Sequence, residues 1–528
     1  GVVIFDEFHE RSLNADLGLA LCLEVAEALR DDLHLVVMSA TLDAAPVAEM
    51  LDAPLVTSEG RAYEVTPHWL DRPRGQARLE GAVADLIRDA LRAQTGSALV
   101  FLPGEGEIRR VQGLLDGSFG SDVAVHPLFG AMDFAAQRAA IAPAKTGRKV
   151  VLATAIAETS LTLPDIRIVV DAGLARRARF DPSSGMSRLV TERVTRAEAT
   201  QRAGRAGRVA AGHCYKLWTR GEDGALAAFP PAEIEAGDLT GMALELALWG
   251  ATPEELSFVT PPHPGRYGEA VEVLRMLEAL DAAGRITAHG RALSGLPLHP
   301  RLAHMLVRGG AGAAELAALL AERDILRGMG SDLRLRMQAL RSPDRFGNAV
   351  QRGALARVRQ ETRRLKSRTS GGAQSLGAMA ALAYPDRIGL RRKGDAPRFV
   401  LSGGKGAILP DGDALAGARL IVATDLDGDP REAKIRQATE ISDADLRATF
   451  GDAIAWHDVC LWSKREGRVL ARQQERLGAL VLEDRAWRDA PPEDIAVAML
   501  DGVRQLGLLP SAKAARFLAR ARLVDADD

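Results

Sequence analysis

The first 220 residues alternate short apolar segments with amphipathic ones, and this alternation limits the folds open to the chain. Apolar runs predict buried strands, and a 3.6-residue period predicts helices between them. Strands are expected at residues 1–5, 34–39, 98–102, 123–127, 149–153 and 166–171, and helices at 15–30, 79–93, 105–115 and 132–142. Such alternation favours parallel sheets with right-handed crossovers. A break near Glu59-Gly60-Arg61 indicates two α/β units.

The pattern changes after residue 174. Two apolar and basic segments, 177–180 and 188–191, flank the turn sequence Asp181-Pro182-Ser183-Ser184-Gly185, and this pattern predicts a β-hairpin. Residues 229–372 are mostly helical in pattern, and short strands after Leu382 predict a small β-rich domain, with strands at 398–401, 407–409 and 418–423. The last 80 residues are expected to be helical. The predicted fold class is therefore multidomain α/β, with parallel sheets first and helical and β-rich parts after them.

Size and composition restrict the class of protein. The 528 residues exceed what one core supports, so about three to five domains are expected. A net charge of −2 excludes a globally basic nucleic-acid binder, and any such binding must use local grooves. No apolar run is long enough to predict a membrane span. The scattered Cys22, Cys214 and Cys460 lack metal-ligand spacing and predict reduced thiols in the cytoplasm.

Both ends of the sequence lead us to expect a fragment. Gly1 opens directly on an apolar strand of the kind found inside a sheet, so Gly1–Phe5 is predicted to be buried. Residues 515–528 stop within a charged helical pattern that has no terminating signal. We therefore expect the chain to have been cut at both ends.

The octapeptide Gln201–Arg208 carries the strongest local signal of a binding site. Arg202, Arg205 and Arg208 are three residues apart, so a helix would align their guanidinium groups on one face. The glycines between them each cost a helix about 1 kcal/mol, which indicates close backbone approach. Planar, permanently charged guanidinium groups suit a polyphosphate. A solvent-exposed basic helix is the alternative that the octapeptide alone leaves open.

Polar residues follow three of the expected strands, at the sheet edge where α/β proteins bind ligands. Asp6 and Glu7 follow the first strand, and two such carboxylates can hold Mg²⁺ and polarise a water molecule. Ser39-Ala40-Thr41 can cap a helix or relay hydrogen bonds from a nucleotide. Residues 154–162 can form a plain polar loop or hold phosphates. Each pattern taken alone leaves both interpretations open.

A basic segment occupies residues 323–368, which hold thirteen Arg or Lys against four Asp or Glu, a local net charge of +9. A solvated helical face and a phosphate-binding surface both explain such a run, and the sequence alone does not choose between them.

The order of these motifs resembles that of superfamily-two helicases. The series is Asp6-Glu7-Phe8-His9, Ser39-Ala40-Thr41, Leu99–Gly104, Thr154–Thr162 and Gln201–Arg208. The octapeptide and Glu158–Thr162 resemble the DEAH-box branch, although Phe8 departs from the alanine of that name. The chain also resembles the bacterial HrpB-type members of this branch, in residues 6–12, 331–334 and 383–388.

The resemblance implies a domain order in which ATP binds between two RecA-like domains. The implied domains are the carboxyl-terminal part of the first RecA-like domain (1–58), the second RecA-like domain (59–228), a winged-helix domain (229–300), a ratchet-like helical domain (301–372) and the HrpB-type carboxyl-terminal region (373–528).

The resemblance also implies roles for single residues. The ATP and Mg²⁺ site would comprise Asp6, Glu7, His9, Ser39, Thr41, Gln201, Arg205 and Arg208. Asp6 would hold the metal through water, Glu7 and Gln201 would serve the hydrolytic water, and the last two arginines would act as arginine fingers, worth about 10³–10⁵ in rate. The histidine and the two hydroxyls would couple hydrolysis to domain movement.

Nucleic-acid contacts are implied for Thr154, Thr159, Ser160, Thr162, Arg177, Arg179, Arg334 and Arg336. The 177–191 hairpin matches the place of a strand-splitting wedge, and the basic segment 323–368 would line the nucleic-acid channel.

The leading hypothesis is an ATP-dependent RNA helicase or translocase that moves 3′-to-5′ on single-stranded RNA. A DNA helicase of the same fold stays open, because nothing in the sequence reads a 2′-hydroxyl. A nucleic-acid-binding scaffold without catalysis is the third hypothesis. A loss of catalysis is disfavoured because the residues expected to carry it are all present: Glu7, Gln201, Arg205 and Arg208.

No Gly-x-x-x-x-Gly-Lys-Ser/Thr motif occurs in these 528 residues, so the backbone cradle and lysine for the phosphates are missing from them. We predict that the chain alone hydrolyses ATP negligibly and that an added amino-terminal segment with such a loop restores hydrolysis. Phosphate release with and without nucleic acid checks this. Robust nucleic-acid-stimulated hydrolysis by the 528 residues alone would contradict it.

Overall fold

The computed structural model describes residues 1–40, 44–58, 63–130, 132, 134–144, 146–158, 163–181, 186–369, 372–429, 431–507 and 511–524. The chain forms two compact units. The first comprises residues 1–307, 317–327 and 339–368, and the second comprises residues 308–316, 328–338 and 369–528. No helix among the described residues is long and apolar enough to span a bilayer.

A six-stranded parallel sheet dominates the first unit. Its order is β3-β10-β7-β4-β6-β5, and every neighbouring pair runs parallel. The strands are β3 (Val65–Leu70), β4 (Ser97–Phe101), β5 (Val123–Leu128), β6 (Arg148–Ala153), β7 (Ile166–Asp171) and β10 (Gly212–Thr219). The sequence predicted four of them within a residue or two. It missed the edge strand β3 and its neighbour β10, whose polar and aromatic residues interrupt the apolar pattern.

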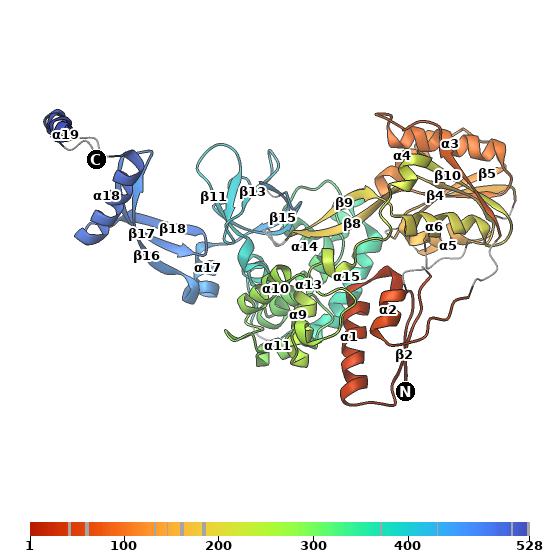
Figure 1. Ribbon diagram of the computed structural model, residues 1–528, viewed down its shortest axis with the longest axis horizontal. Helices are drawn as coiled ribbons and strands as arrows, with labels where there is room; N and C mark the ends of the chain where they lie inside the picture. The colour runs from red at the N-terminus through yellow and green to blue at the C-terminus, as the bar shows by residue number, and fades with distance from the viewer. Residues whose placement is uncertain are drawn as a thin grey trace. The chain divides into compact units, whose positions relative to one another are not determined.

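Helices cover both faces of this sheet (Figure 1). Helices α3 (Leu79–Ala93) and α4 (Glu105–Leu115) bury Ile87 and Ile108 against one face. Helices α5 (Phe134–Ile141) and α6 (Arg196–Gly204) contribute Ala140 and Ala203 to the core on the other. Because both faces are covered, the central strand β4 is buried along its whole length, as its continuous apolar sequence predicted.

Two consecutive cations at the start of β6 hold the ends of helices on opposite faces. Arg148 donates to the carbonyl oxygens of Leu91, Gln94 and Gly96 at 2.9, 2.8 and 2.7 Å, at the end of α3. Lys149 donates to those of Ala140, Ile141 and Ala142 at 3.2, 3.3 and 2.7 Å, at the end of α5. Cations suit these positions because helix carboxyl ends carry unpaired carbonyls and partial negative charge.

The first segment holds a two-stranded parallel sheet of β1 (Val2–Phe5) and β2 (His34–Val37). Helices α1 (Leu13–Ala28) and α2 (Ala45–Met50) pack Leu19 and Val47 on the face that carries Phe5 and Val37. The opposite face is uncovered, with Val2 61% and Ile4 59% exposed. The prediction that Gly1–Phe5 is buried was therefore wrong for this face, because a strand's side chains alternate and helices cover only one side.

Helix α1 also packs against the helices that follow the large sheet. Leu17 joins the core of that helical region. Arg11 donates to the Thr260 hydroxyl at 2.9 Å, its carbonyl accepts from the Glu233 amide at 3.0 Å, and the Glu24 carboxylate accepts from the Trp249 indole at 2.5 Å. These contacts fix the start of the chain on the 229–300 region.

The predicted hairpin is present as β8 (Leu174–Asp181) and β9 (Met186–Arg193), with Arg177 opposite Val190. It leaves the carboxyl end of β7 and leads into α6. The helices after the sheet are α7 (Arg220–Gly224), α8 (Glu233–Ala236), α9 (Thr240–Trp249), α10 (Pro264–Met276), α11 (Ala288–Ser294), α12 (Pro300–Arg308), α13 (Ala313–Ala321), α14 (Leu333–Arg341) and α15 (Arg352–Leu365).

The second unit contains a closed five-stranded barrel of order β11-β12-β13-β15-β14. Its elements are α16 (Leu376–Ala383), β11 (Ile388–Arg391), β12 (Arg398–Leu401), β13 (Gly406–Ile408), β14 (Leu420–Leu426), β15 (Ala433–Glu440) and α17 (Asp443–Phe450). The predicted strands near 398, 407 and 418 all belong to this barrel, so the predicted β-rich region is confirmed.

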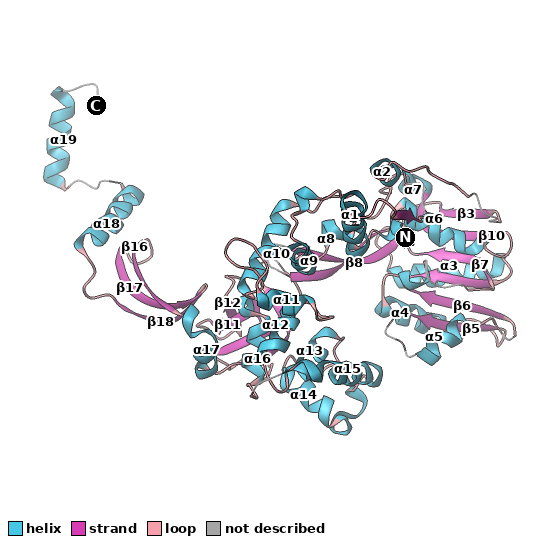
Figure 2. Cartoon of the chain, turned by 90° about the horizontal axis from the view of Figure 1, so that it is seen from below, coloured by secondary structure: helices cyan, strands magenta, loops and turns pink. Residues whose placement is uncertain are grey.

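A second sheet follows the barrel, where the sequence predicted helix. Strands β16 (Ala455–Ser463), β17 (Arg468–Leu477) and β18 (Leu480–Ala486) form an antiparallel meander, beside which α18 (Pro492–Leu506) packs (Figure 2). Helix α19 (Ala512–Val524) ends the described chain. The prediction of helix was wrong for 455–486 because strong helix formers such as those of 472–476 lie in a strand. Gly467, with φ of +62°, marks the first turn.

Candidate functional site

The Asp-Glu pair stands at the carboxyl end of β1, where the chain turns sharply. Glu7 adopts a left-handed conformation with φ of 50°, which is uncommon for a residue other than glycine. Its amide donates to the Asp6 carboxylate at 2.8 Å, and the buried Phe8 follows, 6.3 Å from the Phe5 ring. Strain of this kind often occurs at functional sites, and here it leaves both carboxylates exposed.

His9 links the Asp-Glu pair to the loop after β2. Its Nδ1 accepts a hydrogen bond from the Ala40 amide at 3.2 Å and lies 3.4 Å from the Glu7 carboxylate. The described contact of His9 therefore joins two motifs of the first segment, beside Ser39. Thr41 lies outside the described residues.

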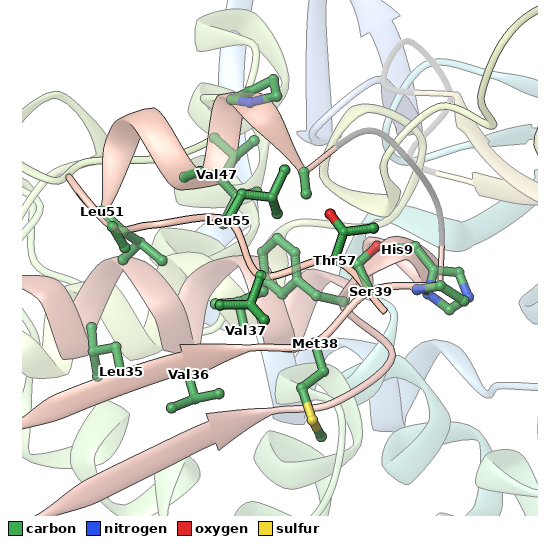
Figure 3. Close-up of a pocket in the computed structure, with 18 of the residues that line it drawn as sticks. His9, Leu35, Val36, Val37, Met38, Ser39, Val47, Leu51, Leu55 and Thr57 are labelled. Carbon is green, nitrogen blue, oxygen red and sulfur yellow. Dashed lines mark hydrogen bonds between the residues drawn. The ribbon is translucent and has the colours of Figure 1, made fainter. Parts of the chain in front are cut away.

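A cavity of about 710 Å³ opens beside His9 and Ser39 (Figure 3). Figure 3 shows these two residues and Thr57 at one end, with Leu35, Val36 and Leu51 toward the other. Most of its lining is apolar, and Asp6, Glu7 and the octapeptide do not line it. The cavity therefore adjoins the Asp-Glu pair, and Arg11 is the arginine among its lining residues.

The octapeptide begins as helix α6 and tightens to a 3₁₀ turn at Arg205–Gly207. The arginines of the octapeptide nevertheless lie in different surroundings. Arg202 is 1% exposed and points into the protein, whereas Arg208 is exposed. The prediction of three guanidinium groups on one face was therefore wrong for Arg202.

Arg202 forms the centre of a buried ionic network. Its Nε donates to Glu158 at 2.6 Å, and its Nη1 donates to Asp171 at 2.8 Å and to the Leu174 carbonyl at 3.2 Å. The guanidinium carbon lies 5.0 Å from the centre of the Phe101 ring. Burial disfavours the charged guanidinium, but the carboxylates of Asp171 and Glu158 outweigh it and raise the pKa of Arg202. One side chain thus joins α6 to the ends of β4 and β7, to the 3₁₀ turn after β6 and to the start of the hairpin.

Arg205 is the residue of the octapeptide whose charge interacts with the Asp-Glu pair, through Glu7. Burial and the nearby charge of Arg208 lower the pKa of Arg205 to about 10, and the charges of Glu158 and Glu7 act in the opposite direction. The guanidinium stays protonated at neutral pH and is near enough to Glu7 for their charges to interact. Gln201 is half-buried on α6, one residue before Arg202.

The octapeptide glycines differ in their purpose. A side chain at Gly207 would meet the Tyr63 carbonyl oxygen at 2.5 Å, and the Gly207 carbonyl accepts from the Tyr63 amide at 2.9 Å. A side chain at Gly204 would meet nothing within 4 Å. The predicted close backbone approach is therefore found at Gly207 and not at Gly204.

The residues predicted to contact nucleic acid differ in their exposure and in their contacts. Thr154 is half-buried after β6, while Thr159, Ser160 and Thr162 lie outside the described residues. Arg177 and Arg179 of the hairpin both bind Glu192, with closest distances of 3.2 and 3.0 Å. Both hairpin arginines are thus held in ion pairs.

Arg334 and Arg336 differ from each other. Arg334 is half-exposed, with its Nε 2.8 Å from the Asp332 carboxylate. Arg336 is 3% exposed and donates to the carbonyls of Met329 and Asp332 at 3.2 and 3.1 Å. A buried guanidinium bound to backbone does not present itself to phosphates, so the expectation for Arg336 is not supported and we assign it a structural role.

Two carboxylates of the site, Asp171 and Glu198, were not singled out from the sequence, and Glu158 was quoted only as the start of a motif, without a role of its own. Glu198 had a readable signal, because Thr195-x-x-Glu198 is a capping-box pattern, and both of its reciprocal hydrogen bonds form. Asp171 ends a buried strand, but the chain gives no indication that Arg202 is its partner.

A parallel sheet covered on both faces, with arginines of a Gln-Arg-x-x-Arg-x-x-Arg octapeptide beside an Asp-Glu pair, defines a RecA-like helicase core. The model of the helicase conserved C-terminal domain matches residues 81–210, and that of the connector region of ATP-dependent RNA helicase HrpB matches residues 453–487. The second match coincides with the β16–β18 sheet.

The ATP-dependent RNA helicase HrpB of Escherichia coli is 40% identical over 96% of this chain and 62% of its own length. A crystal structure of Escherichia coli DEAH/RHA helicase HrpB superposes with a TM-score of 0.81 at 38% identity, covering all of this chain and 67% of the other. The pre-mRNA-splicing factor ATP-dependent RNA helicase prp22 of Schizosaccharomyces pombe is 34% identical over 58% of this chain and 27% of its own length. The chain belongs to the HrpB family of DEAH-box helicases and spans about three fifths of its Escherichia coli relative.

We predict that Arg202→Met lowers the free energy of opening of the six-stranded sheet by about 3–5 kcal/mol, because it leaves buried carboxylates without a counter-charge. Native-state hydrogen exchange of the amides of β4, β6 and β7 measures this quantity. Arg92→Met, which removes a 74% exposed arginine paired with Asp89, is the matched control and should change it by less than about 1 kcal/mol. Equal effects of both changes would contradict a central role for Arg202.

Proposed function

We propose that this chain supplies most of an ATP-driven RNA helicase or translocase in which ATP lies between the Asp-Glu pair and the octapeptide. The observation that carries the proposal is the position of Arg205: it is 95% buried, adjoins Arg208, and interacts with the charges of Glu7 and Glu158. An arginine beside Arg208 and within electrostatic range of Glu7 supports the opposed charges that a metal-bound triphosphate requires.

The donor types fit Mg²⁺ and ATP. Asp6 and Glu7 are exposed carboxylates, and Mg²⁺ prefers oxygen ligands, of which one or two carboxylates with phosphates and waters suffice. In this proposal Asp6 holds the Mg²⁺ ion through a water molecule. The bound ion would offset the negative charge of the phosphates. Glu7 and Gln201 orient and polarise the attacking water, while Arg205 and Arg208 stabilise charge that develops on the phosphates.

Coupling to movement is assigned to the residues around His9. Its hydrogen bond to the Ala40 amide connects the Asp-Glu pair to Ser39 and, one residue further along the chain, to Thr41. A change of charge at the pair can therefore reach the loop after β2 through one side chain.

Nucleic acid is proposed to contact Thr154, Thr159, Ser160 and Thr162, the exposed face of Arg334 and the 177–191 hairpin. The Escherichia coli relative is named an RNA helicase, which favours RNA. The 3′-to-5′ direction and the domain limits at 58, 228, 300 and 372 rest on the resemblance of the motifs, and the proposed cytoplasmic location rests on the scattered cysteines. The net charge of +9 over 323–368 supports the channel assignment for its exposed part.

We predict that Glu7→Gln lowers the rate of ATP hydrolysis at least about 10²-fold while RNA affinity changes less than about two-fold, because a positioned base contributes rate and not binding. The protein must include a phosphate-loop segment. Hydrolysis is measured by phosphate release and affinity by fluorescence anisotropy. Glu27→Gln, an exposed change on α1, is the control. A parallel loss of hydrolysis and RNA binding would show that the role of Glu7 is misassigned.

Comparing single-stranded RNA with DNA of the same sequence tests the substrate. We expect RNA to stimulate hydrolysis roughly ten-fold more at subsaturating concentration, which corresponds to about 1.4 kcal/mol of discrimination by 2′-hydroxyl contacts. Equal stimulation would favour a helicase that does not distinguish the two, and stimulation by DNA alone would replace the RNA assignment. An absence of hydrolysis with either polymer would favour the non-catalytic scaffold.

A further inference from the structure

The hairpin β8–β9 is joined to helix α6 by an ion pair that the proposed function does not use. Arg177 Nη2 lies 2.6 and 2.5 Å from the two carboxylate oxygens of Glu198. The two side chains are only 16% and 14% exposed. Partial removal from water strengthens such a pair relative to a surface salt bridge, whose contribution is usually small.

The same carboxylate also fixes the start of α6. Glu198 accepts from the Thr195 amide at 2.7 Å and from the Thr195 hydroxyl at 2.8 Å, while the Thr195 hydroxyl caps the Glu198 amide. The hairpin and helix α6 therefore both bind the Glu198 carboxylate. A displacement of Arg177 acts directly on the residue that positions the first turn of the helix.

Helix α6 connects this point to the octapeptide. Gln201 and Arg202 lie on it, and Arg205 begins the 3₁₀ turn at its end. The nine residues of α6 form a short rod of roughly 13 Å at 1.5 Å per residue, so a shift at its start is carried to its end. Arg202 anchors that end to Glu158 and Asp171.

The hairpin is stiffened on the side of this contact. Glu192 accepts from Arg179 Nε at 3.0 Å and from Arg177 Nη1 at 3.2 Å, which makes the series Arg179–Glu192–Arg177–Glu198 along the hairpin. Further out, Arg266 of α10 lies 5.7 Å from the centre of the Phe180 ring. Arg177 and Arg179 are therefore parts of one connected series of ion pairs.

We propose that Arg177 and Glu198 are positioning residues that transmit displacement of the hairpin to Arg205. The inference rests on the proposed function, in which nucleic acid bears on the hairpin and ATP on the octapeptide. It replaces the direct phosphate contact predicted for Arg177, because both terminal nitrogens of that side chain already bind carboxylates.

The test measures base pairs unwound per ATP hydrolysed, in a protein that includes the phosphate-loop segment. Arg177→Gln and Glu198→Gln each remove one charge, and glutamine at 198 retains the capping hydrogen bond. Each change should lower the number of base pairs unwound per ATP at least about five-fold, because coupling between two linked sites usually changes an equilibrium by at least that factor. The rate of ATP hydrolysis in the presence of RNA should change less than about two-fold. The double variant should be no worse than either single one. Arg193→Gln, which breaks the pair between the hairpin and Glu222, is the matched control and should leave the ratio unchanged.

Additive effects of the two changes, or an equal fall in unwinding and hydrolysis, would overturn the coupling. So would an equal effect of Arg193→Gln, since any loosening of the hairpin would then suffice. Melting temperatures within a few degrees of the unchanged protein are expected, and a large loss would assign the pair a structural role instead. A parent protein that hydrolyses no ATP and unwinds no duplex would overturn the proposed function itself, which separates that failure from the failure of the coupling.

Discussion

The buried guanidinium of Arg202 is the contact on which the arrangement of the site depends. It satisfies Asp171, the last residue of β7, and Glu158, which follows β6, and its guanidinium lies near the ring of Phe101, the last residue of β4. A charge placed this deep is tolerable only when its partners are within hydrogen-bonding distance. The network therefore specifies one packing of α6 on the sheet, and Arg205 obtains its position from that packing.

The octapeptide consequently combines two tasks in eight residues. Arg202 and Gly207 attach it to the protein, through ions on one side and through backbone contact with Tyr63 on the other. In the proposed function, Arg205 and Arg208 are the octapeptide residues that face the phosphates.

The sequence predicted the parts of this fold that local patterns encode. The buried strand at 97–101, the hairpin and the motif order follow from apolar runs, turn residues and spacing. The inward direction of Arg202 did not follow, because its partners Glu158 and Asp171 are distant in the sequence and only the fold brings them to it. The β16–β18 sheet was missed since charged helix formers occupy its middle strand, where cross-strand partners decide the structure. The burial of Arg336 was missed although the carbonyls that it binds, those of Met329 and Asp332, precede it by only seven and four residues.

The adjacent caps at Arg148 and Lys149 have a consequence for how this domain can vary. Side chains alternate along a strand, so the arginine serves the helix on one face and the lysine the helix on the other only in one register. Inserting or deleting one residue between this dipeptide and the rest of β6 would exchange the two faces and leave both helix ends with the wrong cation. Length differences among relatives should therefore be accommodated in the preceding loop, before Arg148, and this dipeptide gives a fixed point for aligning them.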